Sequence, residues 1–437
     1  MPVSLFSSAL YSGLFADEEL VRLLSDASDV AHMVAFERAL AVVQGRLGVI
    51  PAEAAEAIAA GLSDITIDPA ALAAGTVSAG VPVPALVAEL RRRVGGEAGS
   101  WLHWGATSQD VIDTAMVLQV KVAIGLLAAQ LGKLIDTLQR QSERHAGRLL
   151  AGRTRSQIAT PITLGYRIAQ WAHPLIDTEL ALPELRRTAL KIQFGGASGI
   201  NSAIAPDGSP VSAALAKELD LQDSPSWHVN RTPVLALGAW LQQLGAGLAK
   251  MAGDLVLLGR SEISEVRSGS GGGSSTMPQK ANPVQAEAIL ALQQISIAAQ
   301  AGLAAAASPL EERDGARWPL EWQFLPQMLI ATGAMLNHGL ALAETLEPND
   351  EKLAATLSDN PELMAEAASF LLTKHGVPRG DAKDLVAKAA ASSEPFAEAL
   401  AKSTDLGIDW KMDLDPASVL APSREMAARI FAKRTAT

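Results

Sequence analysis

A long stretch without proline constrains this chain more than any other feature of its sequence. Residues 110–148 contain no proline, and apolar side chains recur there at steps of three and four residues. These side chains are Met116, Val120, Ala123, Leu127, Leu131, Leu134 and Leu138. Because an α-helix has about 3.6 residues per turn, this spacing places them on one helical face. The stretch is therefore predicted to form one long helix.

Three more long helices are expected in the middle of the chain, at about 234–263, 284–307 and 320–345. Residues 288–310 carry no charged side chain over 23 positions. Helices of this kind expose too little polar surface to stand alone in water. We expect them to pack as a bundle and, because one bundle cannot cover every apolar face, to pack against other subunits as well.

Composition supports a helical fold and excludes several classes of function. Apolar residues make up 49% and charged residues 19%, with two Tyr and eight Phe, a balance that favours helix over sheet. The chain has no cysteine, so it has no disulfide, thiolate metal site or cysteine nucleophile. The net charge of −11 disfavours general nucleic-acid binding.

Neither a signal peptide nor a membrane span is expected. The N-terminus lacks a basic region followed by a long apolar core. The uncharged stretch 288–310 is long enough to cross a bilayer, but Gln293, Gln294, Ser296 and Gln300 within it argue against a lipid-facing helix. We expect a cytoplasmic protein.

The chain of 437 residues exceeds what one hydrophobic core usually serves, and three domains are expected. Residues 1–109 contain shorter amphipathic helices, at 26–47 and 51–62. Residues 110–347 hold the long-helix bundle. From 348 to 437 the charge density rises and the periodic segments shorten, which suggests a small helical C-terminal domain. The predicted fold class is all-α.

The segment GSGGGSSTMPQKANP, residues 269–283, is the strongest chemical signal. It has no Gly-Lys-Ser/Thr of a Walker loop and no G-x-G-x-x-G after a strand. A passive linker is also a poor description, because Met277, Pro278 and Pro283 restrict the backbone, while Lys280 and Asn282 offer directed donors. We therefore expect a loop that carries reactive groups.

Three blocks of this sequence resemble the active-site regions of the fumarase/aspartase superfamily. The segment GSSTMPQKANP is similar to its signature loop, G-S-S-x-M-P-x-K-x-N-P. HWGATSQD (103–110) and GRTRSQIATPITLG (152–165) resemble two further blocks, in the family's order. Within the superfamily, ALAVVQGRLGVIP, GVPVPALV and EERDGARWPLEWQFLP are most similar to the family of 3-carboxy-cis,cis-muconate cycloisomerases.

The resemblance implies a homotetramer with a 20-helix core, no metal or cofactor, and active sites that each draw on three subunits. It also implies elimination or its reverse, in which a base removes the proton α to a carboxylate. By resemblance the base is Ser274, with Lys280 and Asn282 placed to stabilise the charge that develops. The alternative for Ser274 is a small turn residue.

Arg155 departs from the superfamily, where most members have histidine after Gly-Arg-Thr. That histidine protonates the leaving group, and a carboxylate, already stable as an anion, does not need it. The departure favours lactonisation of 3-carboxy-cis,cis-muconate, in the protocatechuate branch of the β-ketoadipate pathway. Arg155 is then expected to hold a substrate carboxylate. The alternative is a structural salt bridge.

Two other functions remain open. An adenylosuccinate lyase-type enzyme, which releases fumarate, would need a histidine donor from elsewhere. An inactive helical scaffold would have no chemical use for Ser274, Lys280 and Asn282, the predicted catalytic residues.

The predicted substrate-binding residues are His103, Thr107, Ser108, Arg153, Arg155, Gln157, Thr160, His228, Arg231, Arg313 and Arg317. Several of them have a plainer alternative. The hydroxyls before the long helix can serve as caps, the histidines can be structural, and the last two arginines can pair with Glu311, Glu312 or Asp314. The remaining histidines share no metal-ligand spacing, so no metal is predicted.

Overall fold

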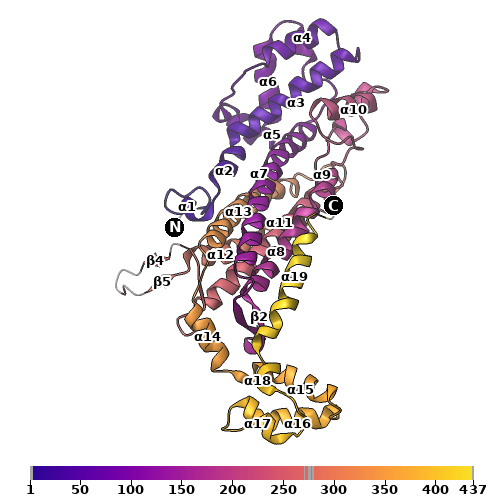
Figure 1. Ribbon diagram of the computed structural model, residues 1–437. Helices are drawn as coiled ribbons and strands as arrows, with labels where there is room; N and C mark the ends of the chain where they lie inside the picture. Colours follow the sequence, from indigo (N-terminus) through magenta and orange to yellow (C-terminus); the bar gives the residue numbers. More distant parts are fainter. Residues whose placement is uncertain (1–2, 270, 274–276, 278–279, 436–437) are drawn as a thin grey trace. The chain divides into compact units, whose positions relative to one another are not determined.

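The computed structural model describes residues 3–269, 271–273, 277 and 280–435, and it is mostly helical, as predicted (Figure 1). Its long helices are α7 (Ser108–Arg144), α8 (Leu164–Leu180), α11 (Thr232–Leu258), α12 (Val284–Ala306) and α13 (Trp318–Glu344). All but α8 were expected from apolar periodicity. In α7, Leu127, Leu131, Leu134 and Leu138 are fully buried, which confirms the predicted face.

Contacts divide the chain into two compact units. One comprises Met1–Leu131, Thr178–Ala246 and Ala291–Asn337, and is called unit 1. The other comprises Gly132–Asp177, Gly247–Leu290 and His338–Thr437, and is called unit 2. The three domains expected from the sequence, with boundaries at 109/110 and 347/348, stay a prediction.

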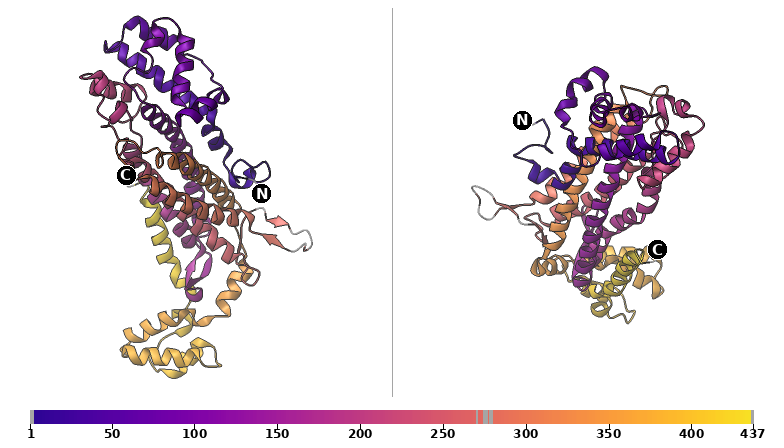
Figure 2. Two further views of the ribbon diagram at one scale, coloured as in Figure 1. Left: turned by 180° about the vertical axis from the view of Figure 1, so that it is seen from behind. Right: turned by 90° about the horizontal axis from the view of Figure 1, so that it is seen from above.

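Unit 1 begins with a run of helices that includes the two predicted at 26–47 and 51–62. They are α1 (Ser12–Phe15), α2 (Glu18–Leu23), α3 (Asp26–Arg46), α4 (Ala52–Gly61), η1 (Pro69–Leu72), α5 (Ala73–Ala79), α6 (Val83–Val94) and η2 (Ala98–Trp101). Helices α3 and α4 lie side by side in every view (Figure 2). A β-carbon on Gly45 would lie 2.3 Å from that of Ala55, so glycine permits this close packing. The unit also contains α9 (Leu182–Ala189), η3 (Gly196–Ser198), η4 (Ser202–Ile204) and α10 (Gly208–Glu218).

Unit 2 contains short strands that the sequence did not predict. They form three antiparallel pairs: β1 (Leu149–Thr154) with β2 (Gln157–Thr163), β3 (Val266–Arg267) with β6 (Glu347–Pro348), and β4 (Gly272–Gly273) with β5 (Ala281–Asn282). The first pair is a hairpin whose two turn residues, Arg155 and Ser156, have positive φ of 50° and 64°. Two such residues are typical of the tight turn that matches strand twist.

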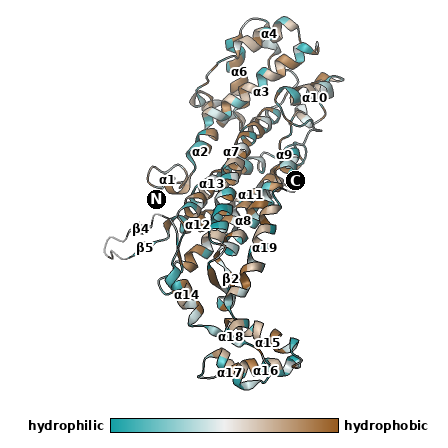
Figure 3. Cartoon of the chain, in the orientation of Figure 1, coloured by the Kyte–Doolittle hydropathy of each residue, from teal (hydrophilic) through white to brown (hydrophobic). Residues whose placement is uncertain are grey.

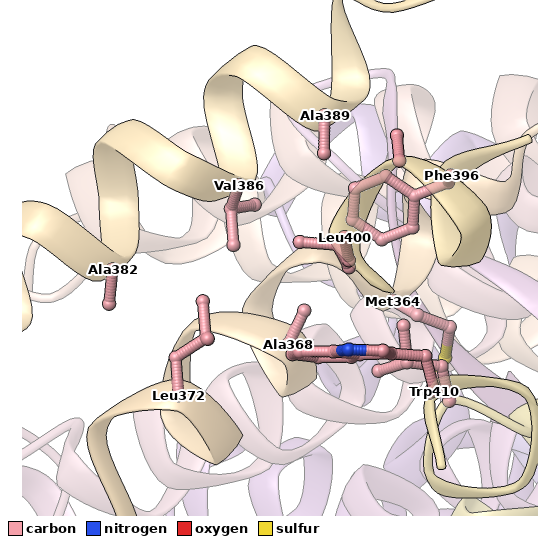
Figure 4. Close-up of a cluster of buried hydrophobic side chains, with 11 residues drawn as sticks. Met364, Ala368, Leu372, Ala382, Val386, Ala389, Phe396, Leu400 and Trp410 are labelled. Carbon is pink, nitrogen blue, oxygen red and sulfur yellow. The ribbon is translucent and has the colours of Figure 1, made fainter. Parts of the chain in front are cut away.

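The C-terminal part of unit 2 contains an apolar core formed by residues between 364 and 414. The elements are α14 (Asp350–Ser358), η5 (Pro361–Met364), α15 (Ala365–Lys374), α16 (Arg379–Ala390), α17 (Phe396–Ser403), α18 (Trp410–Asp413), η6 (Pro416–Val419) and α19 (Leu420–Ala432). Leu372, Leu400, Phe396 and Trp410 pack together in it (Figure 4). The small helical C-terminal domain expected from the sequence at 348–437 stays a prediction.

Hydrophobic residues run along α11 (Figure 3). Two other helices, α7 and α12, are long and apolar enough to cross a membrane, judged by length and composition alone. The core helix of a soluble protein meets the same criteria, and 61% of the apolar window of α7 is buried.

Candidate functional site

The first sequence block ends in a helix cap made by Asp110, and not by the hydroxyls of Thr107 or Ser108, for which capping was the alternative to substrate binding. In unit 1, the backbone N–H of Thr107 donates to Oδ2 of Asp110 at 3.0 Å, the pairing of an N-terminal residue with the third residue of the helix. Neither the hydroxyl of Thr107 nor that of Ser108 hydrogen-bonds to a described residue. Both hydroxyls remain available for the predicted substrate contacts, and these contacts stay a prediction.

Asp110 also fixes a neighbouring loop. Its carboxylate is fully buried and accepts from Nε2 of Gln193 at 3.0 Å and from the backbone N–H groups of Gly195 and Gly196, each at 2.9 Å. Burial raises the pKa of Asp110 to about 6, against these hydrogen bonds and that of Thr107, which favour the ionised form. Asp110 was not among the predicted site residues, although its position three residues after Thr107 fits the capping pattern.

His103 is paired with a buried acid that is distant in sequence. Its Nδ1 lies 2.5 Å from Oε1 of Glu37, a residue of α3 that is 1% exposed. Burial lowers the pKa of His103, but Glu37 outweighs that effect and raises it overall. The imidazolium form is therefore favoured, and His103 can present positive charge or a proton.

The surroundings of His228 shift its pKa in the opposite direction, downwards. Its Nδ1 lies 2.8 Å from the hydroxyl of Ser226, which also accepts a hydrogen bond from Nε2 of Gln193 at 2.8 Å. Its ring lies against Gly199, where an added β-carbon would be 2.1 Å from Cε1. Burial, followed by the charge of Arg313, lowers the pKa of His228 and favours the neutral ring. Its buried Nε2 has no hydrogen-bond partner among the described residues.

Arg231 lies in a buried ion network. It donates to Asp113 at 2.7 and 3.2 Å and to Glu321 at 2.8 and 2.5 Å, and the whole residue is only 4% exposed. Its guanidinium also lies 4.5 Å from the ring centroid of Trp227. The guanidinium of Arg231 is thus bound by two buried carboxylates of the chain. Its predicted contact with substrate stays a prediction.

The two arginines before α13 differ sharply. Arg317 pairs with Asp314 at 2.6 Å, as the plainer alternative expected. Arg313 is exposed and forms no salt bridge with a described residue. Its Nε donates to Oε1 of Gln109 at 3.1 Å, and its Nη2 donates to the carbonyl of Ala197 at 3.2 Å. Gln109 therefore joins the first block to Arg313.

The second block is the β1–β2 hairpin of unit 2. Arg155 lies in its turn, exposed and without an ion pair in the described part of the chain, so the structural salt bridge considered for it is not seen there. Arg153 instead makes two hydrogen bonds of 2.7 Å to Glu265, whose side chain is fully buried. Gln157 and Thr160, both exposed on β2, line a cavity of about 1050 Å³ together with Arg153.

The signature loop continues from β4 to β5. The predicted base, Ser274, lies outside the described residues. Lys280 is exposed and its backbone N–H donates to the carbonyl of Met277 at 3.0 Å, while Asn282 lies on β5 opposite Gly272. Whether Lys280 and Asn282 act on substrate stays a prediction. Within the described ranges, no group of three or more His, Asp or Glu side chains could hold a metal ion.

Comparisons with known proteins show the family to which the chain belongs. A family model described as Lyase matches residues 8–298. The 3-carboxy-cis,cis-muconate cycloisomerase of Pseudomonas aeruginosa is 34% identical over 98% of this chain and 97% of its own length. The chain therefore belongs to this lyase family, within the fumarase/aspartase superfamily.

Two further relatives show the range of reactions among similar proteins. The crystal structure of 3-carboxy-cis,cis-muconate lactonizing enzyme from Pseudomonas putida matches with a TM-score of 0.90 at 32% identity, covering 98% of this chain and 99% of that one. The nitrosuccinate lyase of Streptomyces davaonensis is 34% identical over 84% of this chain and 80% of its own length. Membership of the family therefore does not identify the leaving group. The leaving group must be inferred from the residues of the site.

Proposed function

We propose that this chain is a cycloisomerase that interconverts 3-carboxy-cis,cis-muconate and carboxymuconolactone. The observation that carries the proposal is Arg155, an exposed cation at the hairpin turn where most of the superfamily has a proton-donating histidine. A guanidinium cannot donate a proton at neutral pH, but it binds carboxylates well through paired hydrogen bonds. Relatives that bear the cycloisomerase name over most of the chain support the same reaction.

The reaction needs proton transfer on one side only. In lactonisation, a substrate carboxylate oxygen forms a bond to the carbon that carries the extra carboxyl group. Ser274 delivers a proton to the neighbouring carbon, which is α to another carboxylate. In reverse, Ser274 removes that proton and the lactone oxygen leaves as a carboxylate, which is a stable anion with a pKa near 4. No acid is required on the oxygen side, so no histidine is required at position 155.

Cations and hydrogen-bond donors must stabilise the charge that spreads onto the substrate carboxylate during proton transfer. Lys280 and Asn282 are proposed for this task, as their places in the signature loop imply. Arg155, Arg313 and His103, whose pKa is raised by Glu37, are proposed to bind the carboxylates of the trianionic substrate. We propose that the blocks meet in a cytoplasmic homotetramer, with each site drawing on three subunits.

The alternative function that the geometry of the site also allows is that of an adenylosuccinate-type lyase. An amine leaves poorly without a proton, and His103, whose pKa is raised by Glu37, offers a donor elsewhere than position 155. This observation is the reason to test adenylosuccinate beside the proposed substrate.

The test is a direct assay of purified protein. Loss of the conjugated-diene ultraviolet absorbance of 3-carboxy-cis,cis-muconate is followed with wild type and with Ser274→Ala. We expect rapid loss with wild type and a rate lower by about 10²–10⁴-fold in the variant, the range for removing a general base. No loss of absorbance, together with fumarate release from adenylosuccinate, would reject the proposal.

A further inference from the structure

Gln109 uses every hydrogen-bonding group of its amide except one lone pair. Its Nε2 donates to the carbonyl of His228 at 3.1 Å and to Oδ2 of Asp113 at 3.2 Å, while its Oε1 accepts from Nε of Arg313 at 3.1 Å. The residue is 2% exposed. Because both N–H groups are taken by oxygen acceptors, the amide can present only its oxygen to the arginine. The direction of this oxygen is thus fixed by the fold.

The support beneath Gln109 is rigid. Asp113, which accepts its hydrogen bond, also accepts two from Arg231 and one from Nε1 of Trp318 at 3.0 Å. Arg231 is held on its other side by Glu321. A fully connected buried network of this kind has one low-energy arrangement, because moving any member would leave a buried charge unpaired. The position of Gln109 is therefore set by buried groups.

Arg313, which contacts the amide oxygen of Gln109, forms no ion pair with a described carboxylate. Arg313 is held by two neutral acceptors, Oε1 of Gln109 and the carbonyl of Ala197. These use two of the five N–H groups of a guanidinium and leave the others for a ligand. In a chain of net charge −11, a fixed cation of this kind is suited to an anion, and planar carboxylates are its natural partners.

We propose that Gln109 is a positioning residue that presents Arg313 to one carboxylate of the substrate. The inference rests on the proposed function, because it names a determinant of substrate binding for that reaction. It assigns Gln109 no chemistry of its own. Its contribution is to hold the guanidinium in one orientation before substrate arrives, so that binding loses less side-chain entropy.

The same helix offers a matched control. Gln119, also on α7, is 6% exposed and donates one hydrogen bond, to the carbonyl of Leu23 at 3.0 Å. Replacing either glutamine by methionine keeps the length of the side chain and removes its amide. Only the change at position 109 should disturb Arg313.

The experiment compares Gln109→Met, Arg313→Met, the double variant and Gln119→Met with wild type. Binding of tricarballylate, an unreactive tricarboxylate, is measured by isothermal titration calorimetry, and KM and kcat are measured with 3-carboxy-cis,cis-muconate. Gln109→Met and Arg313→Met should each raise Kd and KM about tenfold, the effect of losing one charge-assisted contact, with kcat changed less. The double variant should be no worse than Arg313→Met, since Gln109 acts through Arg313. Gln119→Met should bind like wild type.

Two results would overturn the inference: Gln109→Met with unchanged Kd and KM but a lower kcat, or effects of the two substitutions that add in the double variant. Wild type that binds tricarballylate without turning over the muconate would reject the proposed function alone, and the binding series would still decide the role of Gln109. Wild type that does neither would reject both.

Discussion

Asp110 joins the start of α7 to the loop at 193–196, and its substitution tests that role. Its two oxygens accept four hydrogen bonds, and in Asp110→Asn an NH₂ group would face two of those donors. A buried donor without an acceptor costs about 1–3 kcal/mol. We expect the variant to lose about 2–5 kcal/mol of unfolding free energy in urea at pH 7. Asp384→Asn, at an exposed position of α16, should stay within about 0.5 kcal/mol of wild type, and equal losses would contradict the account.

We expect the stability of the protein to depend on pH because of His145. It is 1% exposed, its Nδ1 lies 2.8 Å from Nη1 of Arg148, and burial followed by the charges of Arg148 and Arg144 lowers its pKa to about 4. The ordinary pKa of histidine is about 6.5. Between these values the unfolded chain binds a proton that the folded protein does not, so the unfolding free energy falls as pH falls from 6.5 to 4.

The measurement is the urea midpoint of wild type and His145→Asn at pH 7 and pH 4.5. The variant should lose less stability than wild type over this interval, because the proton-linked contribution of His145 is gone. His375→Asn, at an exposed histidine, should keep the wild-type pH dependence. Parallel curves for wild type and His145→Asn would show that this histidine does not carry the effect.

At the scale of elements, apolar periodicity predicted the long helices because burial dominates their residues. Leu127 and Leu131 illustrate this, since both follow the helical period and both are fully buried. The β1–β2 hairpin was missed because its turn lacks the usual Asn-Gly signal. Arg155 and Ser156 adopt positive φ instead, a conformation that local sequence preference does not favour for arginine.

Resemblance to known sequence blocks named several residues of the candidate site but not the residues that hold them. His103 and Arg313 were named from their blocks, but their partners Glu37 and Gln109 were not. Glu37 lies 66 residues before His103, and Gln109 lies 204 residues before Arg313. Contacts over such separations arise from tertiary packing, which periodicity does not encode. The state of each charged group therefore had to come from the structure.

The hairpin allows function to be separated from stability. Arg155→Gly removes the guanidinium and also relieves the positive φ of 50° at that residue. We expect an unchanged or slightly higher Tm, with KM for 3-carboxy-cis,cis-muconate raised about tenfold or more by the loss of one charged contact. Ser156→Gly makes the same backbone change beside it, at φ 64°, and should keep the wild-type KM. A normal KM in Arg155→Gly would remove Arg155 from the site.

At the scale of the whole molecule, assembly should depend on the apolar residues that the single chain leaves exposed. Ile297 of α12 is 47% exposed, and a charge buried there in an interface would lack a partner. If the chain forms the proposed tetramer, Ile297→Lys should shift the sedimentation coefficient from that of a tetramer towards that of a smaller species, with loss of activity. Met412→Lys, at a 69% exposed residue of α18, should sediment as wild type. A fully assembled Ile297→Lys protein would contradict this placement of the interface.

The central claim is that one proton is transferred while the departing or attacking group is a carboxylate. The most direct measurement is proton NMR of the product formed from 3-carboxy-cis,cis-muconate in D₂O. The account predicts an intact lactone with a single deuterium on the carbon α to a carboxylate, and no such product with Ser274→Ala. An unchanged diene, or a lactone whose formation is unaffected by Ser274→Ala, would contradict it.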